Sequence, residues 1–226
     1  MPDPEGSSAE ILKLFSKADL AEIEAAVRAA EQRTSGEIVP FIAGSSDFYA
    51  HAIWKGAAFG AMSATLAAAG FLEIGMFWGD APPLWIAATA AAGAGIGYLL
   101  TAFIPPLKRF LTPADTVERR VKQRAQAGFL EQEIFRTKER PGILIFVSSF
   151  ERRVFLLADT GVTAKVPQEE WDRIVAQITA GIRGGAPGKS MAAAILACGD
   201  LLARHGLARR PDDQNELPDQ AKIRGK

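Results

Sequence analysis

Residues 56–107 read GAAFGAMSATLAAAGFLEIGMFWGDAPPLWIAATAAAGAGIGYLLTAFIPPL, and this stretch decides how the rest of the chain is organised. Within it, only Glu73 and Asp80 carry charge. Its two apolar runs, 56–77 and 84–107, each exceed the roughly 20 residues that a helix needs to cross about 30 Å of hydrocarbon. The linker between them is too short to do more than reverse the chain. The sequence therefore predicts a transmembrane helical hairpin within residues 49–111.

Charges around the hairpin predict its orientation. Lys55 precedes the first run and basic residues follow the second, whereas the connecting linker contains no Lys or Arg. Because Lys and Arg accumulate on the cytoplasmic side of a membrane, we expect both termini and the soluble part in the cytoplasm. Aromatic and basic side chains are expected at the two water boundaries. These membrane-interface residues are Trp54, Trp78, Trp85, Lys108 and Arg109.

Small residues recur at every fourth position along both predicted spans, a spacing that lets two helix backbones approach closely. They are Gly56, Gly60, Ala64 and Ala68 on the first span, and Gly93 and Gly97 on the second. The pattern alone leaves two alternatives open. The close contact lies either within one hairpin or between two copies of the chain, which would then form a homo-oligomer.

Composition outside the hairpin limits the classes of function. The chain has 26 basic and 26 acidic residues, so no overall positive field favours nucleic acid as a partner. A single cysteine, Cys198, excludes a disulfide framework and agrees with a reducing compartment. The polar, proline-bearing ends predict a flexible N-terminus over residues 1–15 and a disordered tail over residues 207–226.

The remaining sequence predicts one α/β domain divided by the hairpin. Ser16 and Asp19 form a capping box that begins a helix reaching about Thr34, and a strand follows at 37–42. After the hairpin, periodicity and turn signals predict a helix, two strands and two further helices. Their expected ranges are about 113–134, 143–147, 153–158, 167–182 and 190–205. Residues 16–48 and 112–206 are thus expected to form a three-layer α/β sandwich around a small mixed sheet.

Four short segments of this domain resemble the TPM domain family, which includes bacterial membrane proteins. They are EQRTSGEI (31–38), PGILIFVS (141–148), RRVFL (152–156) and DTG (159–161). The resemblance implies an α/β sandwich, and it implies acid phosphatase activity and calcium binding as activities to consider. The sequence departs from the family pattern in two places. The turn that is often rich in Asp reads Ser148-Ser-Phe-Glu151 here, and the glycine-rich loop after it keeps only Gly161.

Carboxylates at strand ends are the candidate metal ligands. Glu37, Glu151 and Asp159 adjoin three different predicted strands, and carboxylate oxygens are what Ca²⁺ or Mg²⁺ prefers. Arg152, Arg153 and Gly161 belong to the same candidate site. The alternative interpretation is that these acids are solvated strand-end charges, or that they pair with the two arginines.

Two functions remain open at the level of sequence. The first is a membrane-anchored binding or scaffold module in envelope or membrane-protein maintenance, with the lipid bilayer and other membrane proteins as its partners. The second is a divalent-metal-assisted acid phosphatase. No complete set of catalytic residues can be assembled from the sequence, so the first interpretation is preferred and enzymatic activity stays undecided.

Overall fold

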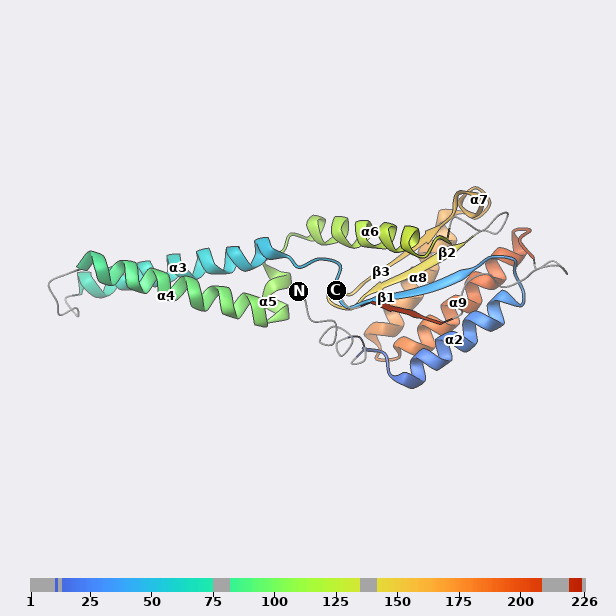
Figure 1. Ribbon diagram of the computed structural model, residues 1–226, viewed down its shortest axis with the longest axis horizontal. Coiled ribbons are helices and arrows are strands. Elements are labelled where there is room, and N and C mark those ends of the chain that lie inside the picture. Colours follow the sequence, from blue (N-terminus) through green and yellow to red (C-terminus); the bar gives the residue numbers. More distant parts are fainter. Residues whose placement is uncertain (1–10, 12–13, 75–81, 135–141, 209–219, 225–226) are drawn as a thin grey trace. The chain divides into compact units, whose positions relative to one another are not determined.

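The computed structural model of the chain describes residues 11, 14–74, 82–134, 142–208 and 220–224. The chain folds into two compact units. Met1–Asp47 and Arg119–Lys226 form an α/β unit, and Phe48–Glu118 form a helical unit (Figure 1).

The α/β unit is built on a mixed sheet of four strands in the order β3-β2-β1-β4. The strands are β1 (Ile38–Ala43), β2 (Ile143–Ser148), β3 (Arg153–Ala158) and β4 (Lys222–Arg224). β1 lies parallel to both β2 and β4, whereas β2 and β3 are antiparallel. Strands from the two sides of the inserted hairpin therefore share one sheet, as the sequence predicts.

Helices cover both faces of this sheet. α2 (Lys17–Glu31), α8 (Gln168–Arg183) and α9 (Pro187–Arg204) pack over one face, whose core contains Ile38, Ile42 and Ile145. α6 (Ala114–Glu131) lies over the other face (Figure 1). There the rings of Phe41 and Phe146 stack at 5.6 Å, and the Arg124 guanidinium lies 5.0 Å from the Phe41 ring centre. The three layers confirm the predicted α/β sandwich.

Local signals define the ends of several elements. The Ser16 hydroxyl accepts the Asp19 N–H at 3.1 Å, and the Asp19 carboxylate accepts the Ser16 N–H at 2.8 Å. This reciprocal capping box begins α2 as predicted. At the other end of the unit, α9 is followed by Gly206 with φ +81°, a conformation that glycine adopts without steric penalty.

Two predictions about the chain ends are wrong in part. Ile11 and Phe15, one helical turn apart, are fully buried and pack in the core cluster together with residues of α2. The prediction rested on the composition of residues 1–15, which does not show that two single apolar side chains are buried. In the predicted disordered tail, residues 222–224 form β4 along β1. β4 pairs only with Phe41–Ala43, which follow Pro40, the residue that has no N–H to donate.

The helical unit contains two long helices, α3 (Ala50–Glu73) and α4 (Pro82–Phe103), and a short third helix, α5 (Pro105–Phe110). The second apolar run was predicted to continue to Leu107, but the helix ends earlier. Ile104 adopts an extended conformation, because the ring of Pro105 disfavours helical geometry in the residue before it.

Glycines bring α3 and α4 into direct backbone contact. A Cβ atom added at Gly60 would overlap the carbonyl of Gly93, and one added at Gly97 would overlap the carbonyl of Gly56. The neighbouring Thr101 is fully buried, and its hydroxyl donates to the Gly97 carbonyl at 2.8 Å. The small-residue faces therefore meet within the hairpin, and a homo-oligomer formed through them stays a prediction.

One helix among the described residues is long and apolar enough to cross a membrane. It spans Pro83–Phe103, with a mean hydropathy of 1.6, and only 11% of it is buried. α3 contains Lys55 near one end and Glu73 at the other and does not meet the same criterion. A spanning pair of helices and its orientation in the membrane therefore stay predictions.

Candidate functional site

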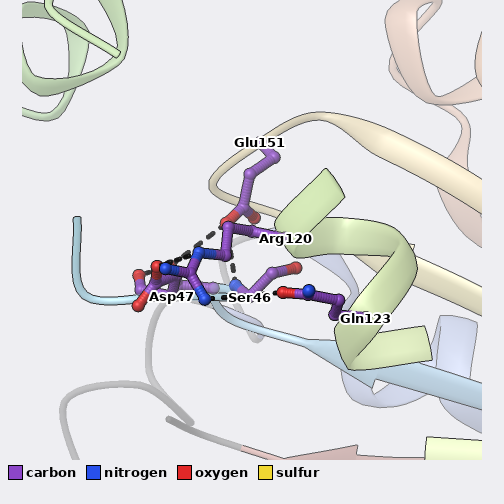
Figure 2. Close-up of polar contacts among 6 residues, drawn as sticks. Ser46, Asp47, Arg120, Gln123 and Glu151 are labelled. Atoms are coloured by element: carbon purple, nitrogen blue, oxygen red, sulfur yellow. Dashed lines mark hydrogen bonds and ion pairs between the residues drawn. The ribbon is translucent and has the colours of Figure 1, made fainter. Parts of the chain in front are cut away.

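A buried carboxylate organises the end of the sheet where β1 and β2 terminate. Glu151 lies in the turn between β2 and β3 and is only 6% exposed. Its Oε1 accepts the Ser46 N–H at 2.8 Å and the Ser45 hydroxyl at 3.3 Å, and its Oε2 accepts the Ser148 hydroxyl. The Glu151 side chain thus ties its own turn to the segment after β1 (Figure 2).

A second interaction joins the same segment to α6. Asp47 Oδ2 and Arg120 Nε form an ion pair at 2.9 Å, and Arg120 also donates to Gln123 Oε1 at 3.4 Å (Figure 2). The hydroxyls of Ser46 and Ser148 are hydrogen-bonded at 3.1 Å. We call this set the polar clasp. Its members are Ser45, Ser46, Asp47, Arg120, Ser148 and Glu151.

The polar clasp lies where the chain leaves the α/β unit and returns to it. The first segment of the unit ends at Asp47 and the second begins at Arg119. Backbone hydrogen bonds reinforce the arrangement, because Ser149 N donates to the Ala43 carbonyl at 3.0 Å and Phe150 N to the Gly44 carbonyl at 2.9 Å. The strand-end residues after β1 and β2 are therefore held together independently of the hairpin.

The three predicted metal ligands do not converge. Glu37 precedes β1, and its carbonyl accepts the Ile143 N–H, while the Asp159 N–H donates to the Gly142 carbonyl. Glu37 and Asp159 therefore lie at the end of the sheet where β1 and β2 begin, opposite the turn that contains Glu151. The expectation of a single site is wrong, because β3 runs antiparallel to β2 and carries Asp159 away from Glu151.

The other candidate residues have identifiable local roles. The Asp159 carboxylate caps the short helix α7 (Thr160–Thr163) by accepting the Thr160 N–H at 2.6 Å, and Gly161 lies within that helix. Arg152 closes the turn between β2 and β3 in a left-handed conformation, with φ +53°. Arg152 and Arg153 are both exposed. Glu37 is 4% exposed at the start of β1.

The polar clasp does not fit the divalent cation that the TPM resemblance implies. Both Glu151 oxygens already accept protein hydrogen bonds, and Asp47 is paired with Arg120. Within the part of the chain that the structure describes, no three His, Cys, Asp or Glu side chains gather as a metal would require. We therefore derive no metal-assisted step from this site.

Two of the clasp residues carry interactions that sequence reasoning missed. A serine-rich segment ending in Asp47 after a strand was a visible signal, and so was the basic stretch that contains Arg120. The pairing of Asp47 with Arg120 could not be predicted, because the whole hairpin separates the two residues in the sequence.

The predicted membrane-interface residues lie in the helical unit. Trp54 is 67% exposed and packs edge-on against Tyr98 at 5.8 Å, and Trp85 is 54% exposed. Lys108 is 8% exposed with its Nζ 5.4 Å from the Phe48 ring centre, so its stem is packed rather than solvated. Arg109 follows it in α5. Trp78 lies outside the described residues.

Comparisons with known proteins agree with this fold. The family model of the TPM domain matches residues 109–201, which confirms the resemblance seen in the sequence. No curated protein matches the chain. The NMR structure of the BA42 protein from the psychrophilic bacterium Bizionia argentinensis is similar, with a TM-score of 0.56 and 18% identity over 92% of this chain and 94% of that chain. At this identity the likeness concerns the fold alone.

Proposed function

We propose that this chain, which carries a TPM domain, is a membrane-anchored binding or scaffold module for other membrane proteins. The α3–α4 hairpin is its anchor, and the α/β unit is the part that binds. The setting is envelope or membrane-protein maintenance at a bacterial inner membrane. Both termini and the α/β unit face the cytoplasm.

The exposed apolar surface of α4 carries this proposal. Large side chains point outward along its whole length, and only 11% of the spanning segment is buried. The most exposed are Leu84, Trp85, Ile96, Leu99 and Phe103. A core helix of a water-soluble protein hides such side chains, since each one left in water forgoes about 1.5–3 kcal/mol of burial free energy. Lipid chains would cover this surface without any protein partner.

The helix α3 also has large apolar side chains on its outer face. Phe59, Met62 and Leu66 are more than half exposed, although its glycines contact α4. Two helices joined at their glycine faces and apolar on their outer faces match the pattern of membrane helix pairs, in which small residues form the contact. The charges of Lys55 and Glu73 lie towards the helix ends, where long side chains reach the headgroup region.

The structure of the polar clasp supports a binding function for the α/β unit rather than a hydrolytic one. Metal-assisted phosphoryl chemistry requires carboxylates free to hold a cation and to activate water. Here the carboxylate of Glu151 is buried and hydrogen-bonded to protein donors. That arrangement supports a stable binding platform rather than a hydrolytic centre.

Topology mapping tests the anchor. A cysteine introduced at Asp80 should react with a membrane-impermeant maleimide from outside intact cells, whereas one introduced at Arg183 in α8 should react only after lysis. The native Cys198 gives no background, because burial raises the pKa of its thiol to about 12. Extraction of the protein from membranes by alkaline carbonate would contradict the anchor. Labelling of the Arg183 position in intact cells would contradict the orientation.

Co-purification tests the scaffold role. The native chain, isolated in a mild detergent, should retain the same membrane proteins in repeated preparations. A variant that keeps the hairpin but lacks residues 119–226 should lose them. Equal recovery with both chains would show that the hairpin alone is responsible, and the α/β unit would then not be the binding part.

A further inference from the structure

The end of the α/β unit that carries the polar clasp has an uncompensated positive charge. The two acids of the clasp are already engaged, because Glu151 is buried and accepts the Ser46 N–H and Asp47 is paired with Arg120. Four other cationic side chains are exposed and form no ion pair with any residue that the structure describes. They are Arg119, Lys122, Arg152 and Arg153, and we call them the basic rim.

Contacts of the clasp place the basic rim at one end of the sheet. Arg120 on α6 reaches Asp47, whose neighbour Ser46 is hydrogen-bonded to Glu151 (Figure 2). The rim residues flank these contacts directly in the sequence. Two lie within two positions of Arg120 on α6, and the other two follow Glu151, one in the turn and one as the first residue of β3. The rim residues therefore adjoin clasp residues on α6 and at the turn between β2 and β3.

This is also the end at which the chain departs for the hairpin. Asp47 is the last residue of the first segment, α3 begins at Ala50, and Arg119 opens the second segment. Two residues, Phe48 and Tyr49, connect Asp47 to α3. The helical unit contributes three further cations, Lys55, Lys108 and Arg109.

We propose that the basic rim binds the phosphate groups of anionic phospholipids in the membrane that the hairpin crosses. The inference rests on the proposed membrane anchor. Arginine guanidinium groups match phosphate oxygens in a bidentate geometry, and two of the four rim residues form a consecutive arginine pair at an exposed turn. Bound in this way, the α/β unit has one preferred face towards the bilayer, and its remaining surface is left for protein partners.

Reconstitution of the full-length protein in nanodiscs tests the proposal. Amide hydrogen exchange of residues 149–153 is compared in discs of phosphatidylcholine alone and in discs with one third phosphatidylglycerol. The turn should be protected in the phosphatidylglycerol discs, and the protection should fall with added salt, because exposed charges are screened over about 8 Å at physiological ionic strength. Each rim residue removed should lower the ratio of docked to free domain about five-fold.

Two double variants in the rim and one control outside it distinguish binding by the rim from an effect of total positive charge. Arg152→Gln with Arg153→Gln should lower the ratio of docked to free domain about 25-fold and so strongly weaken the lipid-dependent protection. Arg119→Gln with Lys122→Gln should weaken the same protection through the other element, and since Gln favours helices, it preserves α6. Arg183→Gln with Lys189→Gln removes the same charge from exposed sites outside the rim and should leave the protection unchanged.

The outcomes distinguish this inference from the anchor on which it rests. Equal exchange in the two lipids, or equal loss of protection in the control variant, would overturn the proposed headgroup site while leaving the anchor intact. Protection that appears only when a co-purifying protein is present would overturn it in favour of an acidic protein partner. Failure of the chain to enter nanodiscs at all would overturn the anchor itself.

Discussion

Asp47 and Arg120 form an ion pair with a 2.9 Å separation between Oδ2 and Nε, although the entire hairpin lies between them in the chain. They stand at the two points where the α/β unit is interrupted, one at the end of its first segment and the other near the start of its second. The pair therefore joins the two points at which the α/β unit is interrupted.

The hairpin should be removable. If a short Gly/Ser linker joins Asp47 to Arg119, the product should be a soluble protein with a single cooperative unfolding transition, since β1 keeps its parallel register with β2. Urea unfolding followed by circular dichroism and by tryptophan fluorescence measures this. Two non-coincident transitions, or none, would show that the two segments do not share a core without the hairpin.

The ion pair itself should contribute little to stability. The side chains of Arg120 and Asp47 are 47% and 30% exposed, so solvent screens their attraction. A double-mutant cycle with Asp47→Asn and Arg120→Gln in the linker-joined domain should give a coupling free energy of about 0.2–1 kcal/mol. The coupling should shrink further in 1 M salt. A coupling well above this range would mean that the pair is less solvated than its exposure indicates.

Glu151 should matter more than the exposed pair. Glu151→Ala leaves the Ser46 N–H and the Ser148 hydroxyl without their acceptor, which should cost about 1–3 kcal/mol in the free energy of unfolding. Glu151→Gln keeps one acceptor oxygen and should cost less. Ser149→Ala is the control in the same turn, because the Ser149 hydroxyl is buried and has no hydrogen-bond partner among the residues that the structure describes. That change should be neutral or stabilising.

Substitution by alanine should destabilise the protein at one glycine of α4 and be tolerated at another. A Cβ at Gly93 would overlap the Gly60 carbonyl and the Ala64 side chain, whereas a Cβ at Gly95 would meet nothing within 4 Å. Gly93→Ala should force α3 and α4 apart at a cost of about 1–3 kcal/mol, and Gly95→Ala should be tolerated. The melting temperature of the full-length protein in detergent measures both. Equal effects would show that the close contact does not lie within the hairpin.

Cys198 should make stability fall at high pH. Burial raises the pKa of its thiol from 9.0 to about 12, so above pH 9 the folded state holds the proton more tightly than the unfolded state. The folded state is therefore favoured below pH 9 and loses stability as pH rises, by up to about 1.4 kcal/mol per pH unit. Cys198→Ala should remove that part of the slope. Alkylation of the native thiol should stay slow until the protein unfolds.

Much of the fold follows from local sequence. Alternating and continuous apolar runs predicted β2 and β3 almost to the residue, and the capping box at Ser16 marked the start of α2. These signals are readable because hydrophobic periodicity and helix capping depend on neighbours within a few positions. The apolar runs of the hairpin are of the same kind, since the length needed to cross hydrocarbon is a local property.

Tertiary structure alone decided which distant residues meet. Strand direction separated Glu151 from Glu37 and Asp159, and the parallel pairing of β1 with β2 brought the segment ending in Asp47 to Glu151 and Arg120. The same holds for β4 on β1. A strand-end acid has the same local sequence whichever end of the sheet it occupies. Its neighbours depend on register and direction, which are set by cooperative packing of the whole core.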